Sequence, residues 1–283
     1  MSINVYQMVT DRIIAELEKG NIPWEWEKPW TGVQSGASSG TTGKAYSLIN
    51  QMLLGKSGKW FTWNQIQAKG WKIRKGERAS FVVFWKNQLI KETDKQTGEE
   101  IKKSIPILKY YNVFHESQID GYEPVPVDPE AVDPATDITA DAIIADYINR
   151  SGVTLEHRKS DEAFYSPSFD RVVLPLREQF PNMAEYYSTA FHELTHSTGH
   201  SSRLNRLTST AHFGSESYSK EELVAEIGAA SLLNYVGIET PKSFRNSTAY
   251  IQSWLKVLRN DSRFIVSAAS RAEKAVNLIL GNA

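Results

Sequence analysis

Two histidines four residues apart, with a glutamate directly after the first, constrain this chain more than any other feature. The motif reads His192-Glu193-Leu194-Thr195-His196 and lies in an apolar, helix-forming run. Residues four apart share one face of an α-helix, so both imidazoles can reach one ion at about 2.0–2.1 Å. Glu193 can then take a proton from a metal-bound water, whose pKa zinc lowers toward about 7. The motif therefore indicates a zinc site of the metallopeptidase type, with His192 and His196 as ligands and Glu193 as the general base.

The remaining ligand must be another histidine or a carboxylate, because the chain contains no cysteine. Disulfides and thiolate ligands are excluded for the same reason. One group of zinc peptidases places a third histidine ten residues after the first, with a glycine at the seventh position. Gly199 fits that spacing, but Ser202 stands at the tenth position and His200 comes two residues early. That arrangement is therefore disfavoured.

A glutamate from a following helix is the other source of a third ligand. The segment Glu222-Leu223-Val224-Ala225-Glu226 places two carboxylates on one helical face. We expect Glu222 to be the third ligand. Glu226 is expected to lie behind a ligand histidine and to fix the tautomer of its ring. The reverse assignment, with Glu226 as the ligand, remains open from the sequence.

Four other residues could bind or polarise a substrate, but the sequence pattern around them gives little support for such a role. His200 and His212 could bind substrate, although an ordinary surface histidine is the favoured interpretation of each. Tyr165 or Tyr218 could polarise a scissile carbonyl, but tyrosine is too common for this to carry much weight.

A proline-rich acidic stretch from Gly121 to about Thr139 divides the chain. Prolines stand at positions 124, 126, 129 and 134, and such a segment is extended and semi-rigid. We therefore predict one domain at 1–120 and another at 140–283, joined by a linker at 121–139. Residues 1–120 hold 17 Lys or Arg against 12 Asp or Glu, whereas the remainder holds 15 against 21. Only the first half suits a polyanionic partner.

The composition is that of an ordinary globular protein, with 41% hydrophobic and 23% charged residues. No run approaches the roughly 18 apolar residues that a membrane helix needs. The N-terminus lacks the basic start and apolar middle of a secretory signal. We expect a cytoplasmic protein without membrane contact.

Apolar periodicity and β-branched runs predict an α+β fold of two domains, one mixed α+β domain and one with a small sheet followed by helices. A small sheet followed by helices is the order of elements seen in zincin-type domains. Residues 94–100 are expected to form a charged hairpin tip. Helices are expected at 5–19, 47–54, 63–68, 140–149, 183–198, 219–235, 248–259 and 263–280, and strands at 79–85, 88–93, 109–114, 153–156, 163–165 and 171–174.

The segment 56–78 combines seven basic residues and one acidic residue with interleaved tryptophans. Single-stranded nucleic acid needs both features, because cations follow phosphates and aromatic faces stack unpaired bases at about 1–3 kcal/mol per base. The competing interpretation is that the tryptophans pack inside and the lysines form a solvated face. The residues expected to contact DNA are Lys59, Trp60, Trp63, Lys72, Arg74, Lys75, Arg78 and Lys86.

Over nearly its whole length the chain resembles the ArdC-type antirestriction proteins of plasmids and other mobile elements. In the first half the similar segments are the two Pro-Trp pairs at 23–24 and 29–30, and residues 46–50, 60–76 and 111–114. In the second half they are residues 191–200, 203–206, 213–214, 218–228 and 268–271.

This resemblance implies an N-terminal domain that binds single-stranded DNA and a C-terminal zincin-like metallopeptidase domain. It also implies a protein that shields incoming DNA from host restriction. One departure is that four residues separate the two Pro-Trp pairs, a wider gap than the family pattern. Glu25 and Glu27 place negative charge in this loop, so no DNA contact is assigned to it.

Three functions follow from these observations. The first is an antirestriction protein that binds single-stranded DNA and hydrolyses a protein substrate at its zinc site. The second is a DNA-binding protector whose zinc domain is not proteolytic in its physiological role. The third is a free peptidase whose basic half recognises a protein or membrane surface.

Overall fold

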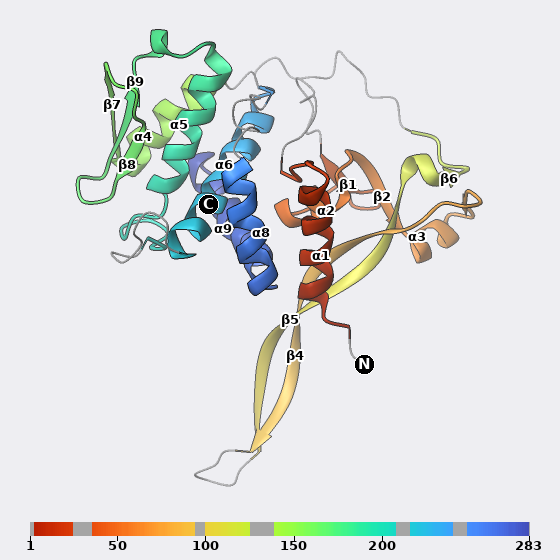
Figure 1. The fold of residues 1–283 in the computed structure, drawn as a ribbon. Coiled ribbons are helices and arrows are strands. Elements are labelled where there is room, and N and C mark those ends of the chain that lie inside the picture. The colour runs from red at the N-terminus through yellow and green to blue at the C-terminus, as the bar shows by residue number, and fades with distance from the viewer. Residues whose placement is uncertain are drawn as a thin grey trace.

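The computed structural model describes residues 3–24, 36–93, 100–124, 139–207, 216–239 and 248–282. Helices and strands are mixed through this part of the chain, so the predicted α+β class is confirmed (Figure 1). The helices are α1 (Val5–Glu18), α2 (Leu48–Leu54), α3 (Trp63–Ala68), α4 (Ala140–Ser151), α5 (Met183–Ser197), α6 (Glu216–Tyr235), α8 (Thr248–Asn260) and α9 (Phe264–Ile279). The strands are β1 (Ala37–Ser39), β2 (Gly58–Thr62), β3 (Lys72–Ile73), β4 (Ser80–Thr93), β5 (Glu100–His115), β6 (Ile119–Asp120), β7 (Thr154–Arg158), β8 (Phe164–Ser166) and β9 (Arg171–Pro175).

Several predicted features lie outside the described residues. They are the loop with Glu25, Glu27 and the second Pro-Trp pair, the charged tip at 94–99, most of the acidic linker and His212.

The strands of the first half are longer than the sequence predicts. The two expected strands at 79–85 and 88–93 form the single strand β4, and β5 begins at Glu100 rather than at residue 109. The two strands pair without a break from Ser80↔Val113 to Thr93↔Glu100. Backbone pairing therefore continues through polar residues that show no apolar periodicity. The resulting hairpin projects from the body of the molecule (Figure 1).

Helix α2 is hydrogen-bonded to both outer strands of the four-stranded sheet, whose order is β1-β2-β5-β4. The Asn50 side chain accepts from the backbone N–H of Val83 at 2.7 Å and donates to its carbonyl at 2.8 Å. Gln51 does the same to Ala37, at 2.7 and 2.8 Å. Two adjacent amides thus complete the backbone hydrogen bonds of two edge strands. One short helix thus contacts both edges of the sheet.

One hydrophobic core contains residues from both sides of the acidic linker. Trp24 and Trp254 meet edge-to-face with ring centroids 5.4 Å apart, and the Thr10 hydroxyl donates to the Ser262 carbonyl at 2.8 Å. The predicted division into two domains stays a prediction, but the halves do pack on each other. The first half contributes Val9, Ile13, Leu17, Trp24, Ile49, Met52, Leu53, Val83 and Leu108, and the second half contributes buried residues of α6, α8 and α9.

A smaller sheet supports the second half. Its order is β7-β9-β8, with β7 parallel and β8 antiparallel to β9. Val172 and Leu174 of β9 are fully buried and share a second core with Tyr147 of α4 and Phe191 of α5. This packing fixes helix α5, which carries the histidine motif. None of the described helices combines the length and apolar character that crossing a membrane requires.

The shared core predicts that the two halves unfold together. Leu258 of α8 is fully buried in this core, so Leu258→Ala should destabilise the protein by about 2–5 kcal/mol. Differential scanning calorimetry should show one transition that moves to lower temperature. The exposed Leu89 provides the control, because Leu89→Ala should change stability by less than about 0.5 kcal/mol. Two separate transitions, of which only one moves, would contradict a common core.

Candidate metal centre

Helix α5 presents its two histidines on the face opposite its main buried stripe. The helix begins at Asn182, whose side chain accepts from the Glu185 N–H at 3.0 Å and so caps the first turn. Tyr186, Ala190 and Leu194 follow at intervals of four and are fully buried in the second core. The histidines at 192 and 196 are therefore left to face helix α6.

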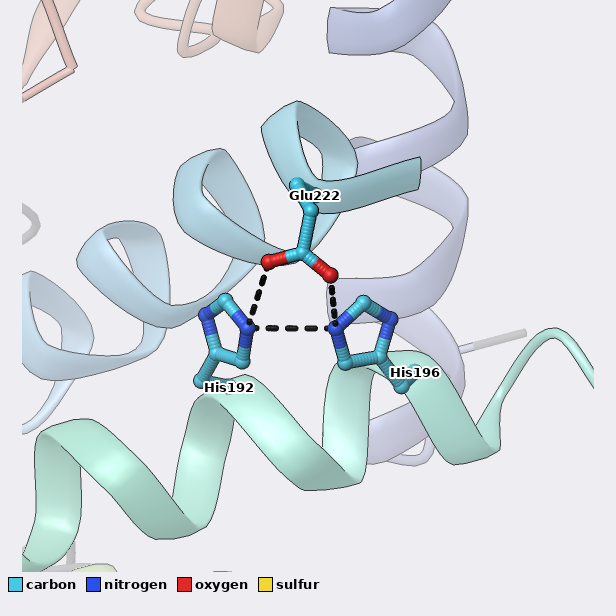
Figure 2. Close-up of side chains that lie close together, drawn as sticks. All are labelled: His192, His196 and Glu222. Atoms are coloured by element: carbon cyan, nitrogen blue, oxygen red, sulfur yellow. Dashed lines mark hydrogen bonds and ion pairs between the residues drawn. The ribbon is translucent and has the colours of Figure 1, made fainter. Parts of the chain in front are cut away.

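Glu222 of α6 points at both histidines of α5, as Figure 2 shows. The two Nε2 atoms of His192 and His196 lie 3.1 Å apart. The Glu222 carboxylate spans them, with Oε2 3.5 Å from the first Nε2 and Oε1 3.4 Å from the second. Each residue offers one ligand atom, and these three atoms all lie within 4.8 Å of one another. Two imidazoles and a carboxylate, with a fourth position left free, are the donor set of a catalytic zinc site.

The close approach of α6 to α5 depends on a glycine. A Cβ atom at Gly228 would lie 2.6 Å from Cγ2 of Thr195, closer than real side chains allow. Thr195 is fully buried, and its hydroxyl donates to the Phe191 carbonyl at 2.7 Å, so it has little room to move. Any larger residue at 228 would push the two helices apart and carry Glu222 away from the histidines.

The outer nitrogens of the histidines face two further carboxylates. Glu226 Oε1 lies 3.8 Å from His192 Nδ1, and Glu221 Oε1 lies 3.2 Å from His196 Nδ1. A carboxylate on Nδ1 favours the tautomer that leaves Nε2 free to bind a metal. The geometry therefore favours Glu222 as the ligand and Glu226 as the residue behind His192, as the sequence led us to expect. Glu221 was missed, because nothing in the local pattern separates it from a surface glutamate.

Arg206 holds Glu221 in place. Its guanidinium donates to both carboxylate oxygens, at 3.0 and 2.9 Å, and to the Thr198 hydroxyl at 2.7 Å. The Arg206 side chain passes close to Gly199. A Cβ atom at position 199 would lie only 3.1 Å from Cγ of Arg206, so the glycine leaves space for the arginine. The segment that follows α5 thus returns to support the histidine at the end of the motif.

The carboxylates set the electrostatics of the site. Burial opposes charging of the imidazoles, but contact with Glu222 still raises the pKa of His192. Burial also lowers the pKa of His196, but its contacts with Glu221 and Glu222 have the larger effect and raise this pKa to about 10. Burial would raise the pKa of Glu222, but the two histidines hold it well below its usual range. The buried carboxylates thus favour a positive charge at this place, which either protonated imidazoles or a bound cation can supply.

Glu193 is 8% exposed and follows the first histidine on the same helix. It is close enough to contribute to the raised pKa of both imidazoles. Of the four residues with weaker support from the sequence, the three that the structure describes do not belong to the ligand group. The Tyr165 hydroxyl donates to Asp170 at 2.8 Å, and His200 pairs with the Ser202 hydroxyl at 2.7 Å. Tyr218 lies one helical turn before Glu222 on α6.

Of the residues expected to contact DNA, Trp60 is not placed to do so. It is only 4% exposed, and its indole N–H donates to the Lys56 carbonyl at 3.2 Å. This prediction was wrong for a physical reason: Trp60 stands on the face of β2 that packs against Val82 and Val113. Lys59 is half-buried beside Ser38.

The other predicted contacts lie on the surface. Trp63 is 53% exposed. Arg74 is exposed but paired with Asp120 at 2.9 Å. The remaining exposed cations of this set are Lys72, Lys75, Arg78 and Lys86.

The comparisons with known proteins agree with this arrangement. Residues 141–271 match the family of zincin-like metallopeptidases, the class that the fold and the metal site define. Residues 3–114 match the N-terminal domain of the anti-restriction factor ArdC. The chain belongs to the ArdC antirestriction family.

Solved structures and sequence relatives cover the whole chain. The metal-free crystal structure of antirestriction ArdC from plasmid R388 is 38% identical, with a TM-score of 0.76 over 99% of this chain and 98% of that one. The Mn(II)-bound form is 36% identical with the same TM-score and coverage. An uncharacterised protein of Sinorhizobium fredii, y4eC, is 32% identical over 96% of this chain and 90% of its own length.

A DNA primase TraC of Escherichia coli is 37% identical over 97% of this chain. The match covers only 27% of that protein, so this chain spans about a quarter of its length.

The contact between Glu221 and His196 predicts a role in metal affinity. Glu221→Gln keeps the size of the side chain but removes the charge that faces Nδ1, so zinc affinity should fall by about 10–100-fold. Competition with a chromophoric chelator measures this directly. Glu239→Gln, a change at an exposed residue beyond α6, is the control and should leave the affinity unchanged. Equal zinc affinity in both variants would show that Glu221 does not support the ligand.

Proposed function

We propose that this protein is an antirestriction protein of a mobile element that binds single-stranded DNA and carries a zinc metallopeptidase site. The observation that carries the proposal is the convergence of His192, His196 and Glu222 beside Glu193. The family relationship supports the antirestriction part. A cytoplasmic location, a single-stranded DNA partner and a protein substrate belong to the same proposal.

Zinc fits the donor set better than manganese or magnesium. Two imidazoles and one carboxylate suit zinc, whereas manganese and magnesium favour sites built mainly from oxygen. A crystal structure of the related ArdC protein from plasmid R388 is Mn(II)-bound, so that relative binds a divalent metal. The buried negative charge described above would favour any divalent cation, and the imidazoles favour zinc over manganese and magnesium.

The proposed reaction is hydrolysis of a peptide bond. A zinc ion bound by these residues would lower the pKa of a water molecule and polarise the scissile carbonyl. Glu193 would accept a proton from that water as its oxygen attacks the carbonyl carbon. The same carboxyl group would deliver the proton to the leaving nitrogen as the carbon–nitrogen bond breaks. Glu221 and Glu226 would keep the histidine rings oriented throughout.

The first half would supply the DNA-binding function. It has a surplus of basic residues, and Trp63, Lys72, Lys75 and Arg78 are exposed on it. Binding through such residues would follow the phosphate backbone and the faces of unpaired bases rather than a base sequence.

A second candidate is a DNA-binding protector whose zinc domain does not cleave protein in its physiological role. The limited exposure of the site favours it, since the side chains of His192, His196 and Glu222 are 14%, 13% and 9% exposed.

Glu193→Gln separates the two candidates. The variant should retain one equivalent of zinc and normal DNA affinity, but lose about 10²–10⁴-fold in peptide hydrolysis, because the general base is gone. Hydrolysis of a fluorogenic peptide mixture, with and without single-stranded DNA, measures the loss. Survival of transferred DNA in a restricting host is the second readout. Full protection by the variant would favour the non-proteolytic protector.

DNA binding should weaken steeply with salt. For the full chain and a fluorescent single strand, log affinity should fall linearly with log salt at about −0.7 per phosphate neutralised. Replacing Lys72, Lys75 and Arg78 by Gln should make the slope shallower by about 2. Fluorescence anisotropy provides the measurement. An absence of salt-dependent DNA binding would leave only the free peptidase that recognises another surface.

A further inference from the structure

An exposed pair of stacked aromatic rings lies on the long hairpin. Phe84 of β4 and Tyr111 of β5 are parallel within 3°, with ring centroids 4.3 Å apart. Phe84 is half-buried, whereas Tyr111 is 53% exposed. The phenylalanine therefore covers one face of the tyrosine ring, and about half of the surface of Tyr111 remains exposed.

The pair stands where the buried part of the sheet ends. Side chains alternate between the two faces of a strand, and Val82 and Val113 share the face of Phe84 and Tyr111. These valines are buried with Trp60 in a small core enclosed by α2. The rings thus continue a hydrophobic face beyond the point where the protein covers it.

Two lysines flank the pair on the same face. Lys109 lies directly opposite Phe84, and Lys86 is two residues further along β4. Both are exposed, and neither forms an ion pair with any other residue in the ranges that the structure describes. Cations that no carboxylate neutralises, beside an open aromatic face, match the phosphates and bases of a single strand.

We propose that Phe84 and Tyr111 form a base-stacking platform for single-stranded DNA, with Lys86 and Lys109 contacting the adjoining phosphates. The proposal rests on the proposed DNA-binding function and specifies a site for it. It moves the stacking role from the buried Trp60 to a pair outside the segment 56–78. A duplex cannot use the platform, because its bases are already stacked on one another. Stacking also depends little on base identity, so binding should tolerate any sequence.

The test uses the full-length protein and a fluorescent oligothymidine of about 15 nucleotides, followed by anisotropy at several salt concentrations. Tyr111→Leu should weaken binding about tenfold or more at every salt concentration, without changing the salt slope. Tyr111→Phe keeps the ring and should bind like the parent protein. Lys109→Gln should weaken binding and make the slope shallower by about 0.7. Duplex DNA of the same length should bind Tyr111→Leu and the parent equally.

Controls separate stacking from folding. Phe169→Leu removes another highly exposed ring, on the other half of the chain, and should leave DNA binding unchanged. Thermal unfolding of each variant shows whether the hairpin is intact, because cross-strand aromatic pairs also stabilise sheets.

The failures of the two proposals are distinguishable. If the parent binds single strands but Tyr111→Leu binds equally well, the platform is wrong and DNA binding stands. Equal loss of single-stranded and duplex binding in Tyr111→Leu would also overturn the stacking role. If the parent itself does not bind, the DNA-binding function fails and the platform fails with it.

Discussion

The contact between helices α5 and α6 is the interaction on which the rest of the site depends. Gly228 lies against the buried Thr195, and this close approach brings three glutamates of α6 to the two histidines of α5. Burying this many carboxylates is costly unless cations compensate them. Arg206 compensates Glu221, and the remaining charge is compensated by protonated histidines or by a metal ion. A divalent cation bound here would therefore offset the cost of burying these carboxylates.

Helix α6 also links this site to the first half of the chain. Its acidic face points to α5, whereas Leu223, Val224 and Ile227 are buried in the core that includes α1 and α2. Helix α2 in turn is hydrogen-bonded to both edges of the sheet from which the hairpin projects. A continuous packed path thus connects the metal ligands to the proposed DNA surface.

Local patterns in the sequence were sufficient for much of this structure. Helical periodicity predicted α5 and α6, and the spacing of Glu222 and Glu226 predicted which face they share. Long-range contacts were not predictable in the same way. Glu221 is held by Arg206, and Asn50 is hydrogen-bonded to Val83, a residue 33 positions away. The burial of Trp60 follows from its packing with Val82 and Val113 of other strands, and Tyr111 on the same face lies outside that core, which no local pattern encodes.

X-ray absorption at the zinc edge, on full-length protein loaded with one equivalent of zinc, tests the central claim most directly. The account predicts two imidazole nitrogens at about 2.0–2.1 Å and a carboxylate oxygen at about 2.0–2.2 Å. The spectrum should lose the carboxylate contribution in Glu222→Ala but keep it in Glu226→Ala. The opposite pattern would make Glu226 the ligand. A parent spectrum without imidazole scattering would contradict a metal centre at this helix pair.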